Sequence, residues 1–213
     1  AGARQPYRIV TPPSAATMAC KRAFDILCSF LGLAVLSPVL LVVSVLVAVT
    51  SPGGVFFRQE RIGKDGRPFR IFKFRSMCKD NAGLKITTGN DSRITPVGRF
   101  LRKSKIDELP QLINVLVGDM SFVGPRPEVA DYVNLYTPYQ RQVLLVRPGI
   151  TGLASIRFRN ENDLLTASDD PNRTYVEQIM PRKIDLDLEY IPHASVFYDI
   201  KLIFQTFAVV IKE

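Results

Sequence analysis

The sequence predicts an α+β, mostly helical protein: a small domain with a β-hairpin, anchored by an N-terminal apolar membrane helix segment. Three observations favour this fold class. The run from Ile26 to Phe57 contains no charged side chain. Two strand-like segments, residues 55–60 and 68–74, flank a turn that contains glycine. Apolar residues in 195–212 recur at the spacing of an amphipathic helix.

Composition limits the chain to one modest domain and a membrane element, because its 213 residues are 46% hydrophobic and 23% charged. The net charge of +8 indicates an anionic partner, which leaves nucleic acid, lipid headgroups or a phosphorylated substrate open. The three cysteines, Cys20, Cys28 and Cys78, are widely spaced and odd in number. They predict neither a disulfide framework nor a zinc site, and they favour a reducing compartment.

Residues 1–20 are rich in Pro, Ala, Ser and Thr, so we expect a flexible N-terminal arm. Residues 21–51 follow as a membrane segment whose apolar stretch is too long for a signal peptide. Its length would suffice for a spanning helix, since about 20 residues cross a bilayer. Ser37 and Pro38 lie at its midpoint, where proline removes a backbone hydrogen bond. We therefore expect a break there, with each half too short to cross.

The charges that flank this run bear on its topology. Basic residues lie before it and after it: Arg4, Arg8, Lys21 and Arg22, then Arg58, Arg61, Lys64, Arg67, Arg70, Lys73 and Arg75. A spanning helix would leave one basic flank outside, whereas a hairpin keeps both flanks in the cytoplasm. The residues alone leave both topologies open, since kinked spanning helices are common. Asp25, at the mouth of the run, is expected to pair with Lys21 or Arg22.

The segments 55–60 and 68–74 predict a hairpin closed by Gly-Lys-Asp-Gly-Arg. In the second segment basic and apolar residues alternate, which is compatible with a solvated cationic strand, or with Lys73 and Arg75 lining an anion site or lying against anionic lipid. Residues 77–95 are polar and lack a period. We expect them to form a loop able to fold over a substrate.

The stretch 102–127 contains two adjacent carboxylates, Asp107 and Glu108. An apolar period that starts at Leu109 predicts a short helix that ends at Gly118. Asp107 would then be its N-cap, and both carboxylates would lie at the positive end of the helix. An ordinary N-cap followed by a first-turn acid is the simplest interpretation of such a pair.

Arginines near this pair favour a second interpretation. Arg102 lies just upstream, and Arg126 lies downstream between two prolines that restrict its backbone. A guanidinium group held in this way can bind phosphate through two donors. Together with the carboxylates, these residues make a phosphate-processing site plausible.

The C-terminal half carries weaker signals. Residues 128–146 predict short helices interrupted by a proline, and RPGITG at 147–152 predicts a turn that presents Arg147. The segment 161–170 is expected to be a solvated acidic loop. The final helix at 195–212 would pack in the core or lie on a membrane interface.

Taken together, these motifs resemble those of the monotopic phosphoglycosyl transferases, the bacterial sugar transferase family that begins glycan assembly on polyprenyl phosphate. The matching pieces are KR-x-FD at 21–25, Ser37-Pro38, FFRQERIGKDGRPFRIFKFRSM at 56–77, LRKSKIDELPQLINVLVGDMSFVGPRP at 101–127 and RPGITGLA at 147–154. A looser likeness extends over 188–210. One departure follows the last motif: Ser155 stands where the family commonly has Gln, while Arg159 and Asn160 match the end of its Asn-Gly-Arg-Asn run.

The resemblance implies an enzyme that transfers a phosphosugar from a UDP-sugar to polyprenyl (undecaprenyl) phosphate and releases UMP. It would initiate assembly of a bacterial glycan such as capsule, O-antigen, exopolysaccharide or glycoprotein. The resemblance implies that Asp107 is the nucleophile of a covalent aspartyl-phosphosugar intermediate, assisted by Glu108, with both residues holding Mg²⁺. Phosphates would be held by Arg102, Arg126, Lys73 and Arg147. Ser155, Arg159 and Asn160 would line the nucleotide-sugar pocket.

The resemblance also implies a location and partners. It favours the re-entrant hairpin for residues 21–51, followed by a catalytic domain at 52–213 with interfacial amphipathic helices. The protein would lie at the cytoplasmic face of the bacterial inner membrane with both termini in the cytoplasm. Its expected partners are the UDP-sugar donor, the polyprenyl phosphate acceptor and membrane lipids, with a homo-oligomer left open and no nucleic acid.

Two other classes of function remain open from the sequence. A membrane-tethered nucleic-acid-binding protein would explain the basic charge, but the chain has no recognisable binding motif and no array of stacking aromatics. A non-catalytic adaptor of a glycan-assembly complex would share the fold. The presence of Asp107, Glu108 and Arg126 argues against the adaptor.

Overall fold

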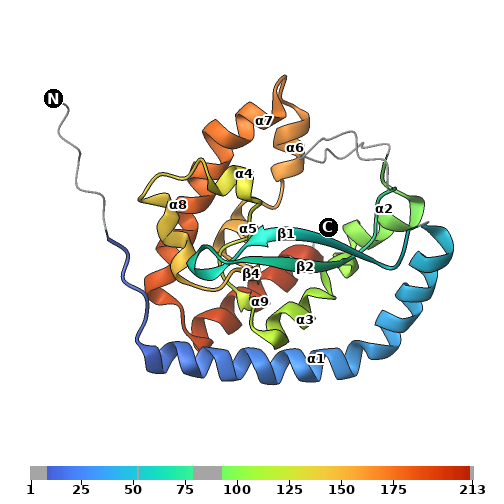
Figure 1. Cartoon of the computed structure of the whole chain (residues 1–213), viewed down its shortest axis with the longest axis horizontal. Coiled ribbons are helices and arrows are strands. Elements are labelled where there is room, and N and C mark those ends of the chain that lie inside the picture. Colours follow the sequence, from blue (N-terminus) through green and yellow to red (C-terminus); the bar gives the residue numbers. More distant parts are fainter. Residues whose placement is uncertain (1–8, 52, 79–92, 212–213) are drawn as a thin grey trace.

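The computed structural model describes residues 9–51, 53–78 and 93–211. Its elements are α1 (Ala15–Thr50), β1 (Phe56–Ile62), β2 (Pro68–Phe74), α2 (Pro96–Lys103), α3 (Gln111–Val117), β3 (Ser121–Val123), α4 (Ala130–Val133), β4 (Gly149–Thr151), α5 (Leu153–Arg157), α6 (Glu161–Thr166), α7 (Pro171–Thr174), α8 (Met180–Tyr190) and α9 (Val196–Ile211). Figure 1 shows the helices arranged around two small sheets. The mostly helical α+β class is confirmed.

The first helix starts earlier than the sequence pattern predicts. It begins at Ala15, where the side chain of Ser14 accepts the N–H of Thr17 at 3.2 Å and caps the first turn. The expected arm of residues 1–20 is therefore too long, because its last six residues are helical. Residues 1–8 of the arm lie outside the described residues.

Where the sequence predicts a break at Ser37 and Pro38, the structure keeps α1 helical through both residues. Pro38 has no N–H for the carbonyl of Ala34, four residues earlier. The hydroxyl of Ser37 donates to that same carbonyl at 2.8 Å and so replaces the missing bond. Figure 1 shows α1 running along the base of the molecule and then bending upward toward α2, without doubling back into a hairpin.

Lys21 fastens the start of α1 to the C-terminal part of the chain. Its ammonium group forms a buried ion pair with Asp199 of α9 and donates to the carbonyl of Val123 at 3.0 Å. The hydroxyl of Tyr190 donates to the other Asp199 oxygen at 2.6 Å. The buried charges of Lys21 and Asp199 are thus paired and hydrogen-bonded, as burial of charges requires.

Asp25, one helical turn after Lys21, binds a different element. Its carboxylate accepts the hydroxyl of Ser121 at 3.1 Å and the N–H of Phe122 at 3.2 Å. The charge of Asp25 also acts on Arg22, whose pKa it raises, but its hydrogen bonds go to β3. The side chain of Asp25 thus holds β3 against α1.

The predicted hairpin is confirmed: β1 and β2 pair antiparallel, with Phe56 opposite Phe74. The fully buried side chain of Asn114, on α3, binds the edge of β2. Its carbonyl oxygen accepts the N–H of Phe72 at 2.9 Å, and its amide nitrogen donates to the carbonyl of Arg70 at 2.8 Å. Because both partners are backbone groups of one strand, Asn114 sets the position of β2 relative to α3.

The segment expected to be only a turn contains a strand, because β4 pairs in parallel with β3. Glycines allow the two chains to approach closely. A Cβ atom on Gly149 would lie 2.1 Å from the backbone nitrogen of Gly124, and one on Gly124 would lie 2.4 Å from the carbonyl oxygen of Arg147. A side chain at either position would collide with backbone, so the sequence needs glycine there.

The main core forms around α8 and the residues that follow it, with Tyr190, Ile191 and Leu202 almost completely buried. The predicted last helix is confirmed as α9. The segment 161–170, expected to be a loop, is helical over α6 and reaches the start of α7. Most of the predicted loop at 77–95 lies outside the described residues, as does Lys212.

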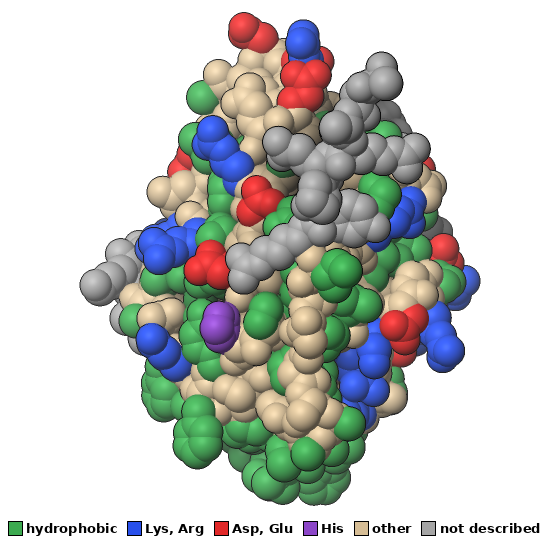
Figure 2. Space-filling model, turned by 90° about the vertical axis from the view of Figure 1, so that its left-hand side faces the viewer, with side chains coloured by type: hydrophobic (Ala, Val, Ile, Leu, Met, Phe, Trp, Pro, Cys, Tyr) green, Lys and Arg blue, Asp and Glu red, His purple; other side chains and the backbone are tan. Residues whose placement is uncertain are grey.

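Apolar side chains remain exposed along the base of the molecule. On α9, Phe197, Phe204 and Phe207 are 87%, 70% and 61% exposed. Among the described residues, α1 is the helix whose length and composition would allow it to cross a membrane, and only 11% of its most apolar window is buried. Figure 2 shows hydrophobic side chains gathered at the base, the side along which α1 runs in Figure 1.

Candidate active site

The adjacent carboxylates lie in a short turn that leads into α3. Asp107 and Glu108 belong to a 3₁₀ turn, and the N-cap position of α3 is occupied by Pro110. Asp107 is therefore not the N-cap that we expected. Gly118 ends the helix as predicted, with a left-handed φ of 102°.

Glu108 is held by two cations that come from distant parts of the chain. Lys73 of β2 lies 2.7 Å from its Oε1 atom, and Arg126 lies 3.1 Å from the same oxygen. Burial alone would raise the pKa of Glu108, but Lys73 and Arg126 oppose it and hold this pKa well below its usual range. Glu108 is therefore ionised at neutral pH.

The pKa values of Lys73 and Arg126 are shifted in opposite directions. Burial lowers the pKa of Lys73, an effect that the nearby Glu108 partly offsets. The carboxylate of Glu108 raises the pKa of Arg126 and stabilises its charged form. The side chain of Arg126 is still 40% exposed, so its guanidinium group is accessible to a ligand.

Asp107 has a buried oxygen without a hydrogen-bond partner among the described residues. This atom is Oδ1, and the residue is only 7% exposed. Burial raises the pKa of Asp107, and the charge of Glu108 raises it further, while Lys73, Arg102 and Lys105 oppose the rise. An ionised carboxylate in this position has an electron pair available for a nucleophilic attack or for a metal ion.

The backbone on either side of Arg126 is held by three hydrogen bonds. The carbonyl of Pro125 accepts the N–H of Gly149 at 2.9 Å, and the carbonyl of Pro127 accepts from Arg61 at 3.2 Å. The carbonyl of Glu128 accepts the N–H of Ile62 at 2.9 Å. The Pro-Arg-Pro segment is therefore fixed to both small sheets, and this positions the guanidinium group of Arg126.

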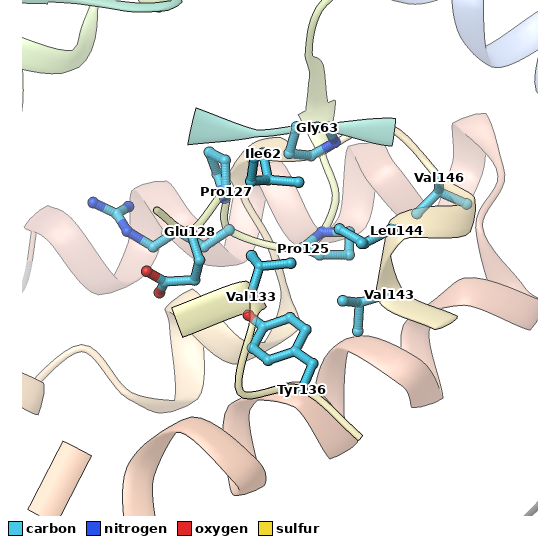
Figure 3. Close-up of a pocket in the computed structure, with 12 residues that line it drawn as sticks. Ile62, Gly63, Pro125, Pro127, Glu128, Val133, Tyr136, Val143, Leu144 and Val146 are labelled. Carbon is cyan, nitrogen blue, oxygen red and sulfur yellow. The ribbon is translucent and has the colours of Figure 1, made fainter. Parts of the chain in front are cut away.

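A small apolar pocket lies behind this segment. Figure 3 shows Pro125 and Pro127 on one side of it, with Val133 and Tyr136 across from them. Glu128 lines the same pocket and accepts a hydrogen bond from the hydroxyl of Tyr175. Because its lining is mostly apolar, we assign this pocket to packing behind the arginine.

The structure places the other predicted phosphate-binding residues in two locations. Arg102 donates to the sulfur of Met77 at 3.4 Å, and its charge lowers the pKa of Asp107, which places it on the side of the carboxylates. Arg147 donates to the carbonyl of Gly118 at 2.8 Å and so lies at the opposite end of α3. The structure therefore brings Arg102 to the site and leaves Arg147 away from it.

The residues expected to line a nucleotide-sugar pocket lie on α5 and just after it. Ser155 is half-buried on α5, while Arg159 and Asn160 are exposed between α5 and α6. The next residue, Glu161, raises the pKa of Arg126 and pairs with Lys183 at 2.7 Å. This end of α6 therefore approaches the site from the side of Arg126.

Sequence reasoning missed two residues that line a second pocket beside the carboxylates. This small pocket is lined by Arg61, Ile71, Lys73, Gln111, Arg126, Pro127 and Gly149. Gln111 follows Asp107 by four residues, a helical spacing that could have indicated it. Arg61 carries no comparable signal, because only the tertiary structure brings it to the pocket.

The carboxylates fit a magnesium ion that completes its coordination with ligands from a substrate. Among the residues that the structure describes, no three His, Cys, Asp or Glu side chains cluster as a metal site. Mg²⁺ is commonly bound by one or two carboxylates together with substrate phosphates and water. The unpaired oxygen of Asp107, adjacent in sequence to Glu108, meets this requirement.

Comparison with known proteins shows which family the chain belongs to. The model of the bacterial sugar transferase family matches residues 16–213. The chain belongs to this family. Both small sheets, the carboxylate turn and α9 all fall within the matched range.

Relatives within the bacterial sugar transferase family have names that specify their substrates. The chain is 43% identical over 202 residues to the UDP-glucose:undecaprenyl-phosphate glucose-1-phosphate transferase of Escherichia coli (strain K12), covering 92% of this chain and 41% of the relative. It is 40% identical over 191 residues to the UDP-N-acetylgalactosamine-undecaprenyl-phosphate N-acetylgalactosaminephosphotransferase of Aeromonas hydrophila, covering 87% of this chain and 42% of the relative.

A shorter relative matches over most of its length. The exopolysaccharide production protein PSS of Rhizobium leguminosarum bv. phaseoli is 40% identical over 196 residues, which cover 87% of this chain and 92% of the relative. The first two relatives are longer, and the chain spans only 41–42% of their length. The shared part thus corresponds to nearly the whole of PSS but to less than half of the other two.

Proposed function

We propose that the protein transfers a phosphosugar from a UDP-sugar to undecaprenyl phosphate and releases UMP. The observation that carries this proposal is the buried Asp107, with its unpaired oxygen, beside a Glu108 that holds Lys73 and Arg126. The names of the relatives support the same donor and acceptor classes. Those relatives name two different sugars at nearly equal identity, so we propose the UDP-sugar class without choosing the sugar.

In the first step, one oxygen of Asp107 attacks the phosphorus that carries the sugar. The bond between this phosphorus and the oxygen that bridges to UMP breaks, and UMP leaves with that oxygen and its electron pair. An acyl-phosphate then joins Asp107 to the phosphosugar. Covalent catalysis of this kind divides one displacement between two bulky anions into two steps.

In the second step, an oxygen of undecaprenyl phosphate attacks the same phosphorus and expels the Asp107 carboxylate. The lipid and the sugar are then joined by a diphosphate, and the enzyme is regenerated. Lys73 and Arg126 stabilise phosphate oxygens in both steps, since each carries a positive charge at Glu108, the residue next to the reacting Asp107. Glu108 keeps these two cations in place before the substrate binds.

Asp107 and Glu108 would also hold Mg²⁺ together with the diphosphate. When bound, the ion reduces the repulsion between the attacking carboxylate and the anionic substrate. The positive charge of Lys105 also lowers the pKa of both carboxylates and so favours their ionised forms.

We propose that the apolar base of the molecule lies in the bacterial inner membrane. The helix that carries the site, α3, packs directly on α1, where Arg22 donates to the carbonyls of Val115 and Leu116 at 2.5 and 2.8 Å. A bent α1 that enters and leaves one leaflet would keep the site at the membrane surface, within reach of a lipid phosphate. Both ends of α1 would then face the cytoplasm.

Isolation of the intermediate tests the proposed reaction. Detergent-solubilised protein incubated with Mg²⁺ and labelled UDP-glucose or UDP-N-acetylgalactosamine, without lipid, should release UMP and retain label. Hydroxylamine should remove this label, and undecaprenyl phosphate should take it up. Asp107→Asn should show neither label nor UMP release, whereas Glu108→Gln keeps the nucleophile and should retain slow labelling. Normal turnover without any label under rapid quench would contradict the covalent route.

A further inference from the structure

The pocket beside the carboxylates is rich in hydrogen-bond donors. Three of its lining side chains, Arg61, Lys73 and Arg126, are cations. A fourth polar side chain, Gln111, is only 2% exposed and lines the same pocket. A small pocket surrounded by positive charge and amide hydrogens favours an anion.

Two donor atoms in this pocket are buried and unpaired. The amide nitrogen of Gln111 and the Nε atom of Arg61 find no acceptor within the part of the chain that the structure describes. Buried donors without a partner are rare in native proteins because each lowers the stability of the fold. Their presence together, in one pocket, therefore calls for a functional explanation.

Gln111 follows the carboxylate turn closely in the chain. Hydrogen bonds from Leu112 to Leu109 and from Ile113 to Pro110, at 3.1 and 3.0 Å, continue this turn into α3. Gln111 lines one pocket with Lys73 and Arg126, the two cations that hold Glu108, the residue next to Asp107. The unpaired nitrogen of Gln111 thus belongs to a residue of the pocket that adjoins the carboxylate turn.

A second buried amide on the same helix provides a contrast. Asn114, three residues after Gln111, is fully buried and bonds to two backbone groups of β2. Both polar atoms of the Asn114 side chain therefore have partners within the protein. Gln111 makes no comparable bond through its amide nitrogen, so the fold does not explain the choice of glutamine at this position.

We propose that Gln111 and Arg61 donate these two hydrogen bonds to a phosphoryl oxygen of the substrate, and that the pocket is an oxyanion subsite for the transferred phosphoryl group. This assignment rests on the proposed function for the identity of the ligand. Donors aimed at phosphoryl oxygens stabilise the charge that is redistributed during transfer. The same oxygens remain on the phosphorus in both steps, so one subsite serves both.

The test uses Gln111→Met, which removes the donor while nearly keeping the volume of the side chain. Its rate of label formation from UDP-sugar, and the rate of the chase by undecaprenyl phosphate, should both fall about 10- to 100-fold, as expected for loss of one hydrogen bond to a charged group. The midpoint of thermal unfolding should stay unchanged or rise by about 2–4 °C, because an unpaired buried donor has been removed.

Two further variants serve as controls. Asn114→Leu should lower the unfolding midpoint, because it leaves backbone groups of Arg70 and Phe72 unpaired. Gln178→Met, at an exposed position, should change neither rate nor midpoint. If Gln111→Met loses stability in parallel with activity, its role is structural and the proposal is wrong. Unchanged rates, or a slower chase with normal label formation, would also overturn it.

A binding measurement keeps this test independent of the proposed reaction. Inorganic phosphate, titrated at constant ionic strength, should raise the unfolding midpoint of the wild-type protein, since a ligand that binds the folded state stabilises it. Gln111→Met should reduce this shift. An equal shift in both proteins would refute the subsite even if the enzyme forms the covalent label. A reduced shift in a protein that never forms label would support the subsite and contradict only the covalent route.

Discussion

At the scale of single residues, the site contains two adjacent carboxylates with different partners and different pKa shifts. Glu108 is bound by Lys73 and Arg126 through one oxygen, whereas Asp107 keeps a buried oxygen without a partner among the described residues. Their pKa values are moved in opposite directions, downward for Glu108 and upward for Asp107. One carboxylate therefore organises cations, and the other remains available for chemistry.

The geometry of Arg126 predicts a strong effect of a conservative substitution. Arg126→Lys keeps the positive charge but loses the planar fork that binds two phosphate oxygens, so kcat/KM for the UDP-sugar should fall by at least about tenfold. UMP release measured at several UDP-sugar concentrations checks this expectation. Arg182→Lys, at an exposed position on α8, is the matched control. A variant Arg126→Lys with nearly normal turnover would show that the arginine is not a phosphate ligand.

The charge around Asp107 predicts a pH dependence. Asp107 must be ionised to attack, so label formation should be present above its pKa and should decline as the pH falls through it. The charge of Lys105 lowers this pKa. Lys105→Asn, which still tolerates the left-handed backbone at this position, should therefore move the acid limb to higher pH.

The matched control for this pH profile is Lys103→Asn, an exposed lysine on α2. The shift caused by Lys105→Asn should shrink at high salt, because the lysine is exposed and its charge is screened. An acid limb that moves to lower pH in Lys105→Asn would contradict the assignment of this limb to Asp107.

At the scale of elements, short backbone contacts hold the site together. The amide of Asn114 binds two backbone groups of β2, and this brings Lys73 of the same strand to Glu108. The parallel pairing of β3 with β4 holds the Pro-Arg-Pro segment through Gly149, whose N–H donates to the carbonyl of Pro125. Small changes in these contacts should therefore displace Lys73 and Arg126 relative to Glu108.

The close approach of β3 and β4 predicts that Gly149 cannot be replaced. A Cβ atom at this position would lie 2.1 Å from one backbone atom and 2.4 Å from another, so Gly149→Ala should destabilise the fold by about 3 kcal/mol. The unfolding midpoint and the rate of UMP release should both drop. Gly32→Ala, whose Cβ would make an ordinary contact at 3.4 Å, should leave both almost unchanged. Equal stability of the two variants would contradict the tight crossing.

At the scale of the whole molecule, apolar side chains collect on one side. The outward faces of α1 and α9 expose large hydrophobic residues, and α3 with its carboxylate turn lies directly above α1. The hydroxyl of Ser37 donates to the carbonyl that Pro38 leaves without an N–H, and α1 is a continuous helix that bends in Figure 1. This shape suits a protein that enters one leaflet and keeps its reactive groups at the membrane surface.

The bend predicts the topology of the chain. Single cysteines introduced as Thr11→Cys and Arg182→Cys, after replacement of the three native cysteines, should both resist a membrane-impermeant thiol reagent in intact cells. Both should react after the cells are made permeable. Adding Pro38→Leu restores a backbone N–H at this position and favours a straight helix, so part of the protein should then span the membrane. Labelling of Thr11→Cys alone in intact cells, without that change, would show that α1 spans.

The sequence alone determined those features that depend on neighbours along the chain. Alternation and a glycine-rich turn predicted the β1–β2 hairpin, Gly118 predicted the end of α3, and a helical stripe predicted α9. Motifs around Asp107 and Glu108 indicated the family and the position of the site. The sequence could not show that the hydroxyl of Ser37 donates to the carbonyl of Ala34 beside Pro38. The spacing of apolar residues predicts a helix, but it does not predict the rotamer or the partner of a hydroxyl group.

Only the tertiary structure decided which distant groups meet. Lys73 and Arg126 reach one oxygen of Glu108, whereas Arg147, equally basic, binds the far end of α3. These outcomes depend on how Asn114 positions β2 and on how closely β3 and β4 approach each other at their glycines. Such contacts join residues that lie many positions apart in the sequence. The buried, unpaired nitrogen of Gln111 belongs to the same class, because a missing partner can be recognised only after every neighbouring atom has been placed.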